Sequence, residues 1–322
     1  MSIAALVILL TAYAGAPQLP SDTVYFTPSI SQPTFTVREP VLRLRPGTVL
    51  ISQTNFGDYY TPEGGSFPGE VGPFYIEGAT TGDVLVVKIL KVTPNYEFAA
   101  SRHYGNFGGL AGDAHTRMLN DPIPDRRYLW RLDPENMTGT TELPDSRMGQ
   151  VTIDLRPMLG RIAVAPRGDE AFSGLWPGDF GGNMDAPELR EGSTVYLPIF
   201  HDGAYFYFGD GHARQGHGEV SGTGLETSMD VAFEIDLIKG KTIDWPRIEN
   251  DGYIMVAGSA RPLIDAYRIA HVELVEWLEQ EYGFGRWDAY QLVSQVGEAT
   301  VANIVDPNYT VVAKFPKRYL PR

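Results

Sequence analysis

Short stretches with apolar residues at alternate positions recur along most of the chain, which is the pattern of half-buried β-strands. Examples are residues 41–44, 84–92 and 231–237. Loops rich in Gly and Pro separate these stretches, as in residues 53–72, where we expect Asp58 and Glu70 to be solvated loop charges. The pattern therefore predicts a mainly β fold with sandwich-like or barrel-like packing of its strands.

Helical spacing of apolar residues occurs only near the end. The apolar positions with this spacing are Leu263, Tyr267, Ala270, Leu274, Trp277 and Leu278. Pro262 suits a first helical turn and Gly283 suits a helix end, so one helix is predicted to about Tyr282. A second is predicted over residues 287–296, before two strands at 300–305 and 309–315. This end of the chain is therefore predicted to form a smaller α+β unit.

We divide the chain into an N-terminal β domain (17–155), a β domain that carries the candidate site (156–256) and the α+β unit (257–322) packed on the β core. Within the first part, residues 116–148 combine mixed charge with several prolines around Trp130. We expect this stretch to be a connection between sheets.

The first residues suggest export. Residues 3–14 are almost wholly apolar, and Ala12-Tyr13-Ala14 matches a secretory cleavage site. The run is short for a membrane span, so no stable membrane insertion is expected. We interpret residues 1–16 as a signal segment of a secreted or periplasmic protein; without a signal, the location would be cytoplasmic.

Composition excludes some partners and some kinds of catalytic or metal site. The chain has 322 residues, 43% of them hydrophobic, enough to bury a substantial core. Its net charge of -14 disfavours nucleic acid as a partner. Because it has no cysteine, disulfides, thiolate metal sites and cysteine nucleophiles are excluded. Carboxylates, imidazoles, amides and hydroxyls remain.

Residues 207–230, YFGDGHARQGHGEVSGTGLETSMD, gather such groups among many glycines. Asp210 and His212 are two residues apart, so in extended backbone both would face one cation. Imidazole with carboxylate suits zinc best, although calcium or manganese is possible. Glu219 could be a further ligand or a general base. The alternative is a glycine-rich hairpin whose Asp and His bond only to turn backbone.

A second glycine-rich stretch, WPGDFGGNMD at 176–185, places Asn183 and Asp185 two residues apart. Their oxygens could complete a coordination sphere or bind a substrate amide. They could equally form an Asx turn before residues 186–190.

Four motifs in order carry a resemblance to a known family: RPMLGRIAVAP (156–166), PGDFGGNMD (177–185), VYLPIF (195–200) and GDGHARQGHGEVSGTGLE (209–226). This succession resembles the acetamidase/formamidase family. The resemblance implies a hydrolase of short linear amides, a small amide substrate and a homo-oligomer, and it makes Glu77 a candidate substrate contact. Where the family usually has Asp between two glycines, this chain has His217.

The hypothesis that follows has Asp210, His212 and Asp185 hold a divalent cation, with Asn183 or His217 as a further ligand. Glu219 would take a proton from water and return it to the leaving nitrogen. Backbone N–H groups of Gly181 and Gly182 would stabilise the oxyanion.

Two alternatives remain open. Ser221 or Ser228 beside His212 or His217 would make a serine-nucleophile amidase, although no G-x-S-x-G motif is present. An exported β-rich module that binds calcium or carbohydrate through the same loops would need no catalysis.

Overall fold

The computed structural model describes residues 22–110 and 123–321. The predicted signal segment, 1–16, lies outside the described residues. Within them, no helix is long and apolar enough to cross a membrane. The prediction of a mainly β fold with two C-terminal helices is confirmed.

Within the described ranges the strands form four sheets. The largest has nine strands, in the order β1 (Thr23–Tyr25), β4 (Thr48–Gln53), β17 (Met229–Ile238), β6 (Val84–Pro94), β15 (Thr194–Pro198), β18 (Arg247–Glu249), β19 (Tyr253–Ala260), β21 (Tyr309–Pro316) and β20 (Glu298–Asn303). The second has six strands, β13 (Pro177–Gly178), β14 (Gly181–Asn183), β11 (Met158–Ala163), β16 (Phe206–His212), β5 (Val71–Ile76) and β3 (Leu42–Leu44). The nine-stranded sheet thus takes strands from all three predicted parts of the chain.

The smaller elements complete the fold. A four-stranded sheet contains β10 (Gly149–Asp154), β9 (Thr138–Leu143), β8 (Arg126–Asp133) and β7 (Phe98–His103), and a two-stranded one pairs β12 (Phe172–Ser173) with β2 (Thr34–Phe35). Short 3₁₀ turns are η1 (Asp58–Tyr60) and η2 (Lys317–Tyr319).

The two large sheets pack face to face through aromatic rings. Phe208 of β16 lies 5.0 Å from Phe233 of β17, centroid to centroid, and Phe206 lies 5.8 Å from the same ring. All three are fully buried. This contact places β16, which carries Asp210 and His212, in the middle of the molecule.

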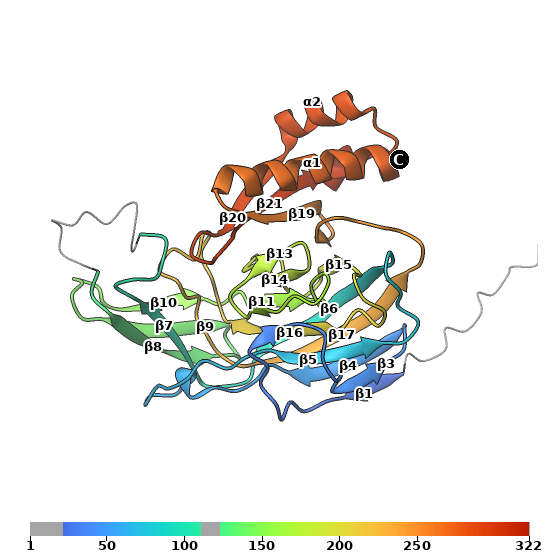
Figure 1. Ribbon diagram of the computed structural model, residues 1–322. Coiled ribbons are helices and arrows are strands. Elements are labelled where there is room, and N and C mark those ends of the chain that lie inside the picture. Colours follow the sequence, from blue (N-terminus) through green and yellow to red (C-terminus); the bar gives the residue numbers. More distant parts are fainter. Residues whose placement is uncertain (1–21, 111–122, 322) are drawn as a thin grey trace, which may run out of the picture.

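Helix α1 (Leu263–Tyr282) ends at Gly283 in the left-handed conformation, as predicted, and α2 (Arg286–Val296) follows. In Figure 1 both helices lie on one side of β19, β20 and β21. Gly258 of β19 permits this packing, because a Cβ there would lie 2.5 Å from the carbonyl oxygen of Ala266.

The expectation that residues 116–148 form a connection is wrong, because β8 and β9 lie within them. Trp130 and Leu132 point into the core, whereas Arg131 between them is exposed. In Figure 1 this sheet extends to one side of the molecule. Charged residues at alternate positions are what an antiparallel sheet with one face in water requires, so the mixed charge of this stretch did not exclude strands.

Candidate active site

Strand β16 delivers two of the predicted residues to one place. It lies between β11 and β5, and at its end Asp210 has the left-handed φ of 59°. The imidazole Nε2 of His212 lies 3.3 Å from Oδ1 of Asp210. Both side chains are almost fully buried, so their charges interact outside bulk water.

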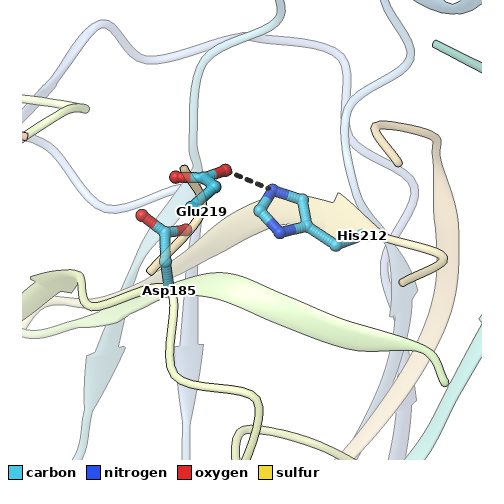
Figure 2. A group of neighbouring side chains, drawn as sticks. All are labelled: Asp185, His212 and Glu219. Carbon is cyan, nitrogen blue, oxygen red and sulfur yellow. Dashed lines mark ion pairs between the residues drawn. The ribbon is translucent and has the colours of Figure 1, made fainter. Parts of the chain in front are cut away.

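Two further acids reach the same imidazole from other segments. Glu219 lies in the turn after β16, with a φ of 49°, and its Oε1 is 4.0 Å from Nε2 of His212. Asp185 follows β14 and has a φ of 45°. Figure 2 shows the carboxyl groups of Asp185 and Glu219 beside each other near the ring. Left-handed backbone at three site acids indicates local strain of the kind that functional sites retain.

Glu226 is the nearest acid to His212, and our sequence-based ligand set omitted it. Its Oε2 lies 3.0 Å from Nε2 of the ring, and its Oε1 accepts the N–H of Gly224 at 2.8 Å. Ligand atoms of two overlapping groups therefore lie within 4.8 Å of one another. The groups are Asp210, His212 and Glu226, and Asp185, His212 and Glu219.

Gln215 determines which imidazole nitrogen carries the proton. Its Nε2 donates to the backbone carbonyls of Asp185 at 2.7 Å and Ala302 at 3.1 Å, so its Oε1 must face the ring. Oε1 lies 2.8 Å from Nδ1 of His212 and accepts its proton. The other nitrogen, Nε2, therefore faces the carboxylates, where it carries a proton in the metal-free protein and offers its lone pair when a metal cation binds.

Several buried atoms in this cluster have no hydrogen-bond partner among the described residues. They are Asp185 Oδ1, Asp210 Oδ1, His212 Nε2 and Glu226 Oε2. Zinc ligands in tetrahedral geometry, at about 2.0–2.2 Å from the ion, lie roughly 3.4 Å apart. The 3.0 and 3.3 Å separations around Nε2 are close to that value. The residues present therefore fit a small divalent cation.

The wider cluster is strongly acidic. Buried carboxyl groups belong to Glu70, Asp185, Asp210, Glu219, Glu226 and Asp306. Arg161 of β11 is the permanent positive charge among them, with Nη1 3.1 Å from Oε1 of Glu70 and Nε 3.4 Å from Oδ2 of Asp210. Because one guanidinium cannot balance six carboxylates, bound protons or a metal cation must supply positive charge.

The interpretation of Glu70 as a solvated loop charge is wrong. Its side chain is buried, and it pairs with Arg161. The chain turns inward here because Asn55 donates to the carbonyl of Glu70 at 3.0 Å and Gln32 exchanges backbone bonds with it. These contacts join residues far apart in sequence, so local composition could not reveal them.

Asn183 positions other groups. Its Oδ1 accepts from Nε of Arg161 at 2.5 Å, while its Nδ2 donates to Asp185 Oδ2 at 2.8 Å and Asp306 Oδ2 at 2.6 Å. Asn303 donates to the same two carboxylates at 3.1 and 2.9 Å. Asp185 is thereby fixed through one oxygen and leaves the other free.

The pKa values follow from this arrangement. Burial raises the pKa of Glu219 and of Asp185 well above the ordinary range, with neighbouring acids adding to the effect. Burial also raises the pKa of Asp210, but the charges of Arg161 and His212 outweigh it and leave that pKa lowered. For His212, burial lowers the pKa, yet Glu226 and Asp210 outweigh it and raise the pKa well above its usual value.

Gly160 of β11 allows the acids to meet. A Cβ at this position would clash with Oδ2 of Asp210 and Oδ1 of Asp185. The strand below the cluster therefore needs a residue without a side chain, which gives the LGR segment of the sequence a physical role.

Other predicted residues lie elsewhere. His217 is exposed, and Glu77 is half-exposed and pairs with Arg45 at 3.4 Å. Gly181 and Gly182 are buried in β14. None of these lines the pocket above His212.

The serine alternative gains no support from the described contacts. Ser221 Oγ lies 3.4 Å from the carbonyl of Thr223, and Ser228 Oγ bonds to Asn95. Nδ1 of His212 is occupied by Gln215, and Nε2 faces acids. Neither serine hydroxyl therefore has a bond to an activating histidine within the described part of the chain.

A model of the Acetamidase/Formamidase family matches residues 168–320. An acetamidase of Mycolicibacterium smegmatis is 26% identical over 52% of this chain, and the match spans only 53% of that relative's length. A crystal structure of an acetamidase from Bacillus halodurans has a TM-score of 0.79 at 25% identity, covering 92% of this chain and 98% of that one.

A further crystal structure is similar over nearly its full length. It is of an acetamidase from Yersinia enterocolitica, 35% identical, with a TM-score of 0.84 and 96% of each chain covered. Together with the four ordered motifs and the matching family model, this similarity shows that the chain belongs to the acetamidase/formamidase family.

Proposed function

We propose that the chain hydrolyses the carbon–nitrogen bond of amides at the cluster around His212, releasing a carboxylic acid and ammonia or an amine, with the help of a divalent cation. The main support is the orientation of His212: the bond from Nδ1 to Gln215 turns Nε2 toward Glu226 and Asp210, so that all three can bind one cation. Family membership supports amides as the substrate class.

The proposed cation ligands are His212, Asp210 and Glu226, with Asp185 close by. Glu226 takes the place that the sequence-based hypothesis gave to Asn183 or His217, because Asn183 gives its oxygen to Arg161 and His217 is exposed. A bound divalent cation would polarise the amide carbonyl and increase the acidity of water. The donor set of one imidazole and carboxylates favours zinc, with manganese and calcium as the other candidates.

Glu219 is the proposed general base. Burial and the neighbouring acids raise the pKa of Glu219 above that of an ordinary glutamate, so it is a stronger proton acceptor, which suits a group that must accept and then donate a proton. It takes a proton from the attacking water and gives it to the departing nitrogen, so that the amine leaves as a neutral molecule. Besides burial, the charges of Glu226, Asp306 and Asp210 raise the pKa of Glu219, and Glu219 in turn raises the pKa of Asp185 beside it.

Chelation and replacement of the cation tests this proposal. We expect purified protein to release ammonia from acetamide, to lose that activity on dialysis against a strong chelator, and to regain it with one of zinc, manganese or calcium. Activity that is unchanged in protein shown by elemental analysis to be metal-free would refute the metal dependence. Absence of hydrolysis with every amide and every metal would refute the amidase.

Export and assembly into a homo-oligomer remain predictions, from the first residues and from the family resemblance respectively. Cell fractionation and light scattering of the purified protein test them. Recovery of the protein only in the cytoplasm, or as a monomer, would contradict them.

A further inference from the structure

The pocket above the acidic cluster is much larger than a short amide requires. Its volume is about 610 Å³. Acetamide has four non-hydrogen atoms and would fill about 120 Å³ at the roughly 30 Å³ that one water molecule occupies in the liquid. Pockets of roughly 300–1,000 Å³ are typical for ligands of drug size. Most of this space would therefore remain empty around acetamide.

The floor and the walls of the pocket differ in chemistry. Asp210, Glu219, Glu226 and Arg161 lie at the floor, where the reaction is proposed. The walls contain the apolar side chains of Pro33, Phe67, Pro68, Phe107 and Leu175, together with the ring of Tyr104. Phe67 is 37% exposed and Leu175 is 43% exposed. Large apolar groups left open beside a polar floor are typical of a site for a hydrophobic ligand group.

The wall at Phe107 is fixed to the turn that carries Glu219. The N–H of Gly109 donates to the carbonyl of Val220 at 2.9 Å, and the N–H of Arg102 donates to Oγ1 of Thr223 at 2.8 Å. Gly222 leaves room for the ring, since a Cβ there would lie 2.6 Å from Phe107. The apolar wall and the proposed base therefore keep a set relative position.

The part of the wall at Phe67 is also held in place. The ring of Phe67 packs edge-on against Tyr59, with centroids 5.3 Å apart, and the guanidinium of Arg161 lies 5.3 Å from the centroid of Phe67. Arg161 itself is bound by Glu70 and Asn183. A substituent that packed against Phe67 and Phe107 would thus meet preformed surfaces, which limits the entropy lost on binding.

We infer that the preferred substrates are amides with a hydrophobic substituent, an alkyl chain of about six carbons or an aromatic ring, rather than formamide or acetamide; this rests on the proposed amidase function. The amide group lies at the acidic floor and the substituent lies along the apolar walls. Each buried methylene is worth about fourfold in binding, so partial burial of a hexyl chain gives a large preference.

The test is a comparison of kcat/KM across substrates in the metal-loaded enzyme. Acetamide, butanamide, hexanamide and phenylacetamide vary the acyl side, and N-benzylacetamide varies the nitrogen side. We expect hexanamide, phenylacetamide or N-benzylacetamide to exceed acetamide by at least about tenfold. If the acyl-side substrates give the larger increase, the acyl substituent packs against the apolar walls. If N-benzylacetamide gives the larger increase, the nitrogen substituent does.

Two variants make the test specific. Leu175→Ala should lower the kcat/KM ratio of the best bulky amide to acetamide by about threefold or more, because part of the wall is lost. Ile264→Ala, at a residue of α1 that is 50% exposed and outside the pocket, should leave that ratio unchanged. The highest kcat/KM for acetamide would overturn this inference and leave the amidase standing. No hydrolysis of any of these amides would instead refute the proposed function itself.

Discussion

Asp83 and Glu219 are both buried acids, but they differ in the hydrogen bonds that their carboxyl groups accept. Asp83 is 4% exposed, and its carboxylate accepts from the N–H and hydroxyl of Thr80 at 2.8 and 2.7 Å, from the N–H of Gly240 at 2.9 Å and from Lys239. Glu219 is 6% exposed, and the charged groups that act on it are the ring of His212 and the acids Glu226, Asp306 and Asp210. The exposed fractions of the two acids are similar, but Asp83 lies close to the surface and Glu219 lies deep inside, and their hydrogen bonding differs as well.

The pKa values move in opposite directions as a result. Burial raises the pKa of Asp83, but its bonds to Lys239, Gly240 and Thr80 outweigh that effect and lower it. At Glu219 burial dominates and the pKa rises. A buried acid whose oxygens all accept hydrogen bonds therefore stabilises the fold, whereas a buried acid without such partners can exchange protons.

The largest expected effect is the loss of turnover when Glu219 is replaced. Glu219→Gln should cut amide turnover at least about a hundredfold, because glutamine cannot accept the proton. The cation should remain bound, since the proposed ligands are other residues. Steady-state kinetics with elemental analysis measures both. Glu77→Gln, the same change at a half-exposed residue outside the pocket, is the matched control. Turnover like that of the wild type in Glu219→Gln would remove it as the base.

The complementary change is Asp83→Asn, which should cost about 2 kcal/mol of stability by weakening hydrogen bonds to a buried charge. Turnover per folded molecule should stay unchanged, because Asp83 is not among the residues that line the pocket. Denaturant titration measures the stability of this variant, and kinetics on the same preparation measure its turnover. A loss of turnover without loss of stability would contradict the division between the two kinds of buried acid.

The last expected effect is the pH dependence of stability in the metal-free protein. Burial raises the pKa of Glu70 to about 8 and the pKa of Asp306 to about 7. Between the two pKa values, the unfolded chain ionises these acids while the fold keeps them protonated, which favours unfolding. The contribution of Glu70 and Asp306 to stability is therefore fully present below about pH 4 and is lost as the pH rises toward 8. The Tm of chelated protein should therefore fall by a few degrees between pH 5 and pH 8.

Glu70→Gln is the control for that slope. Glutamine keeps the shape and loses the titration, so the variant should show a flatter fall of Tm with pH. A wild-type Tm that rises over this interval would contradict the raised pKa values. Adding the cation should reduce the slope as well, because it favours the ionised carboxylates.

The fold class and some of the candidate site residues could be predicted from the sequence. Period-two strands and the two late helices could be predicted because each is a local pattern. Asp210, His212 and Glu219 were found because they lie within ten residues of one another among glycines. Glu70, Arg161 and Asp306 come from segments joined only by sheet pairing and long-range hydrogen bonds, so spacing gave no signal for them. Glu226 lay within the recognised stretch, but only the structure shows it at 3.0 Å from the ring.

Gln215 has a consequence for the order of events during synthesis. The second carbonyl that orients its amide belongs to Ala302 in β20, and Asn303 holds Asp185 from the same strand. His212 can therefore take up its working proton arrangement only after a segment about ninety residues further along has been made and has paired with β21. A partly synthesised chain would bring the acids and the imidazole near one another without fixing them. The C-terminal strand β20 thus supplies two of the hydrogen bonds that fix the site, from Ala302 to Gln215 and from Asn303 to Asp185.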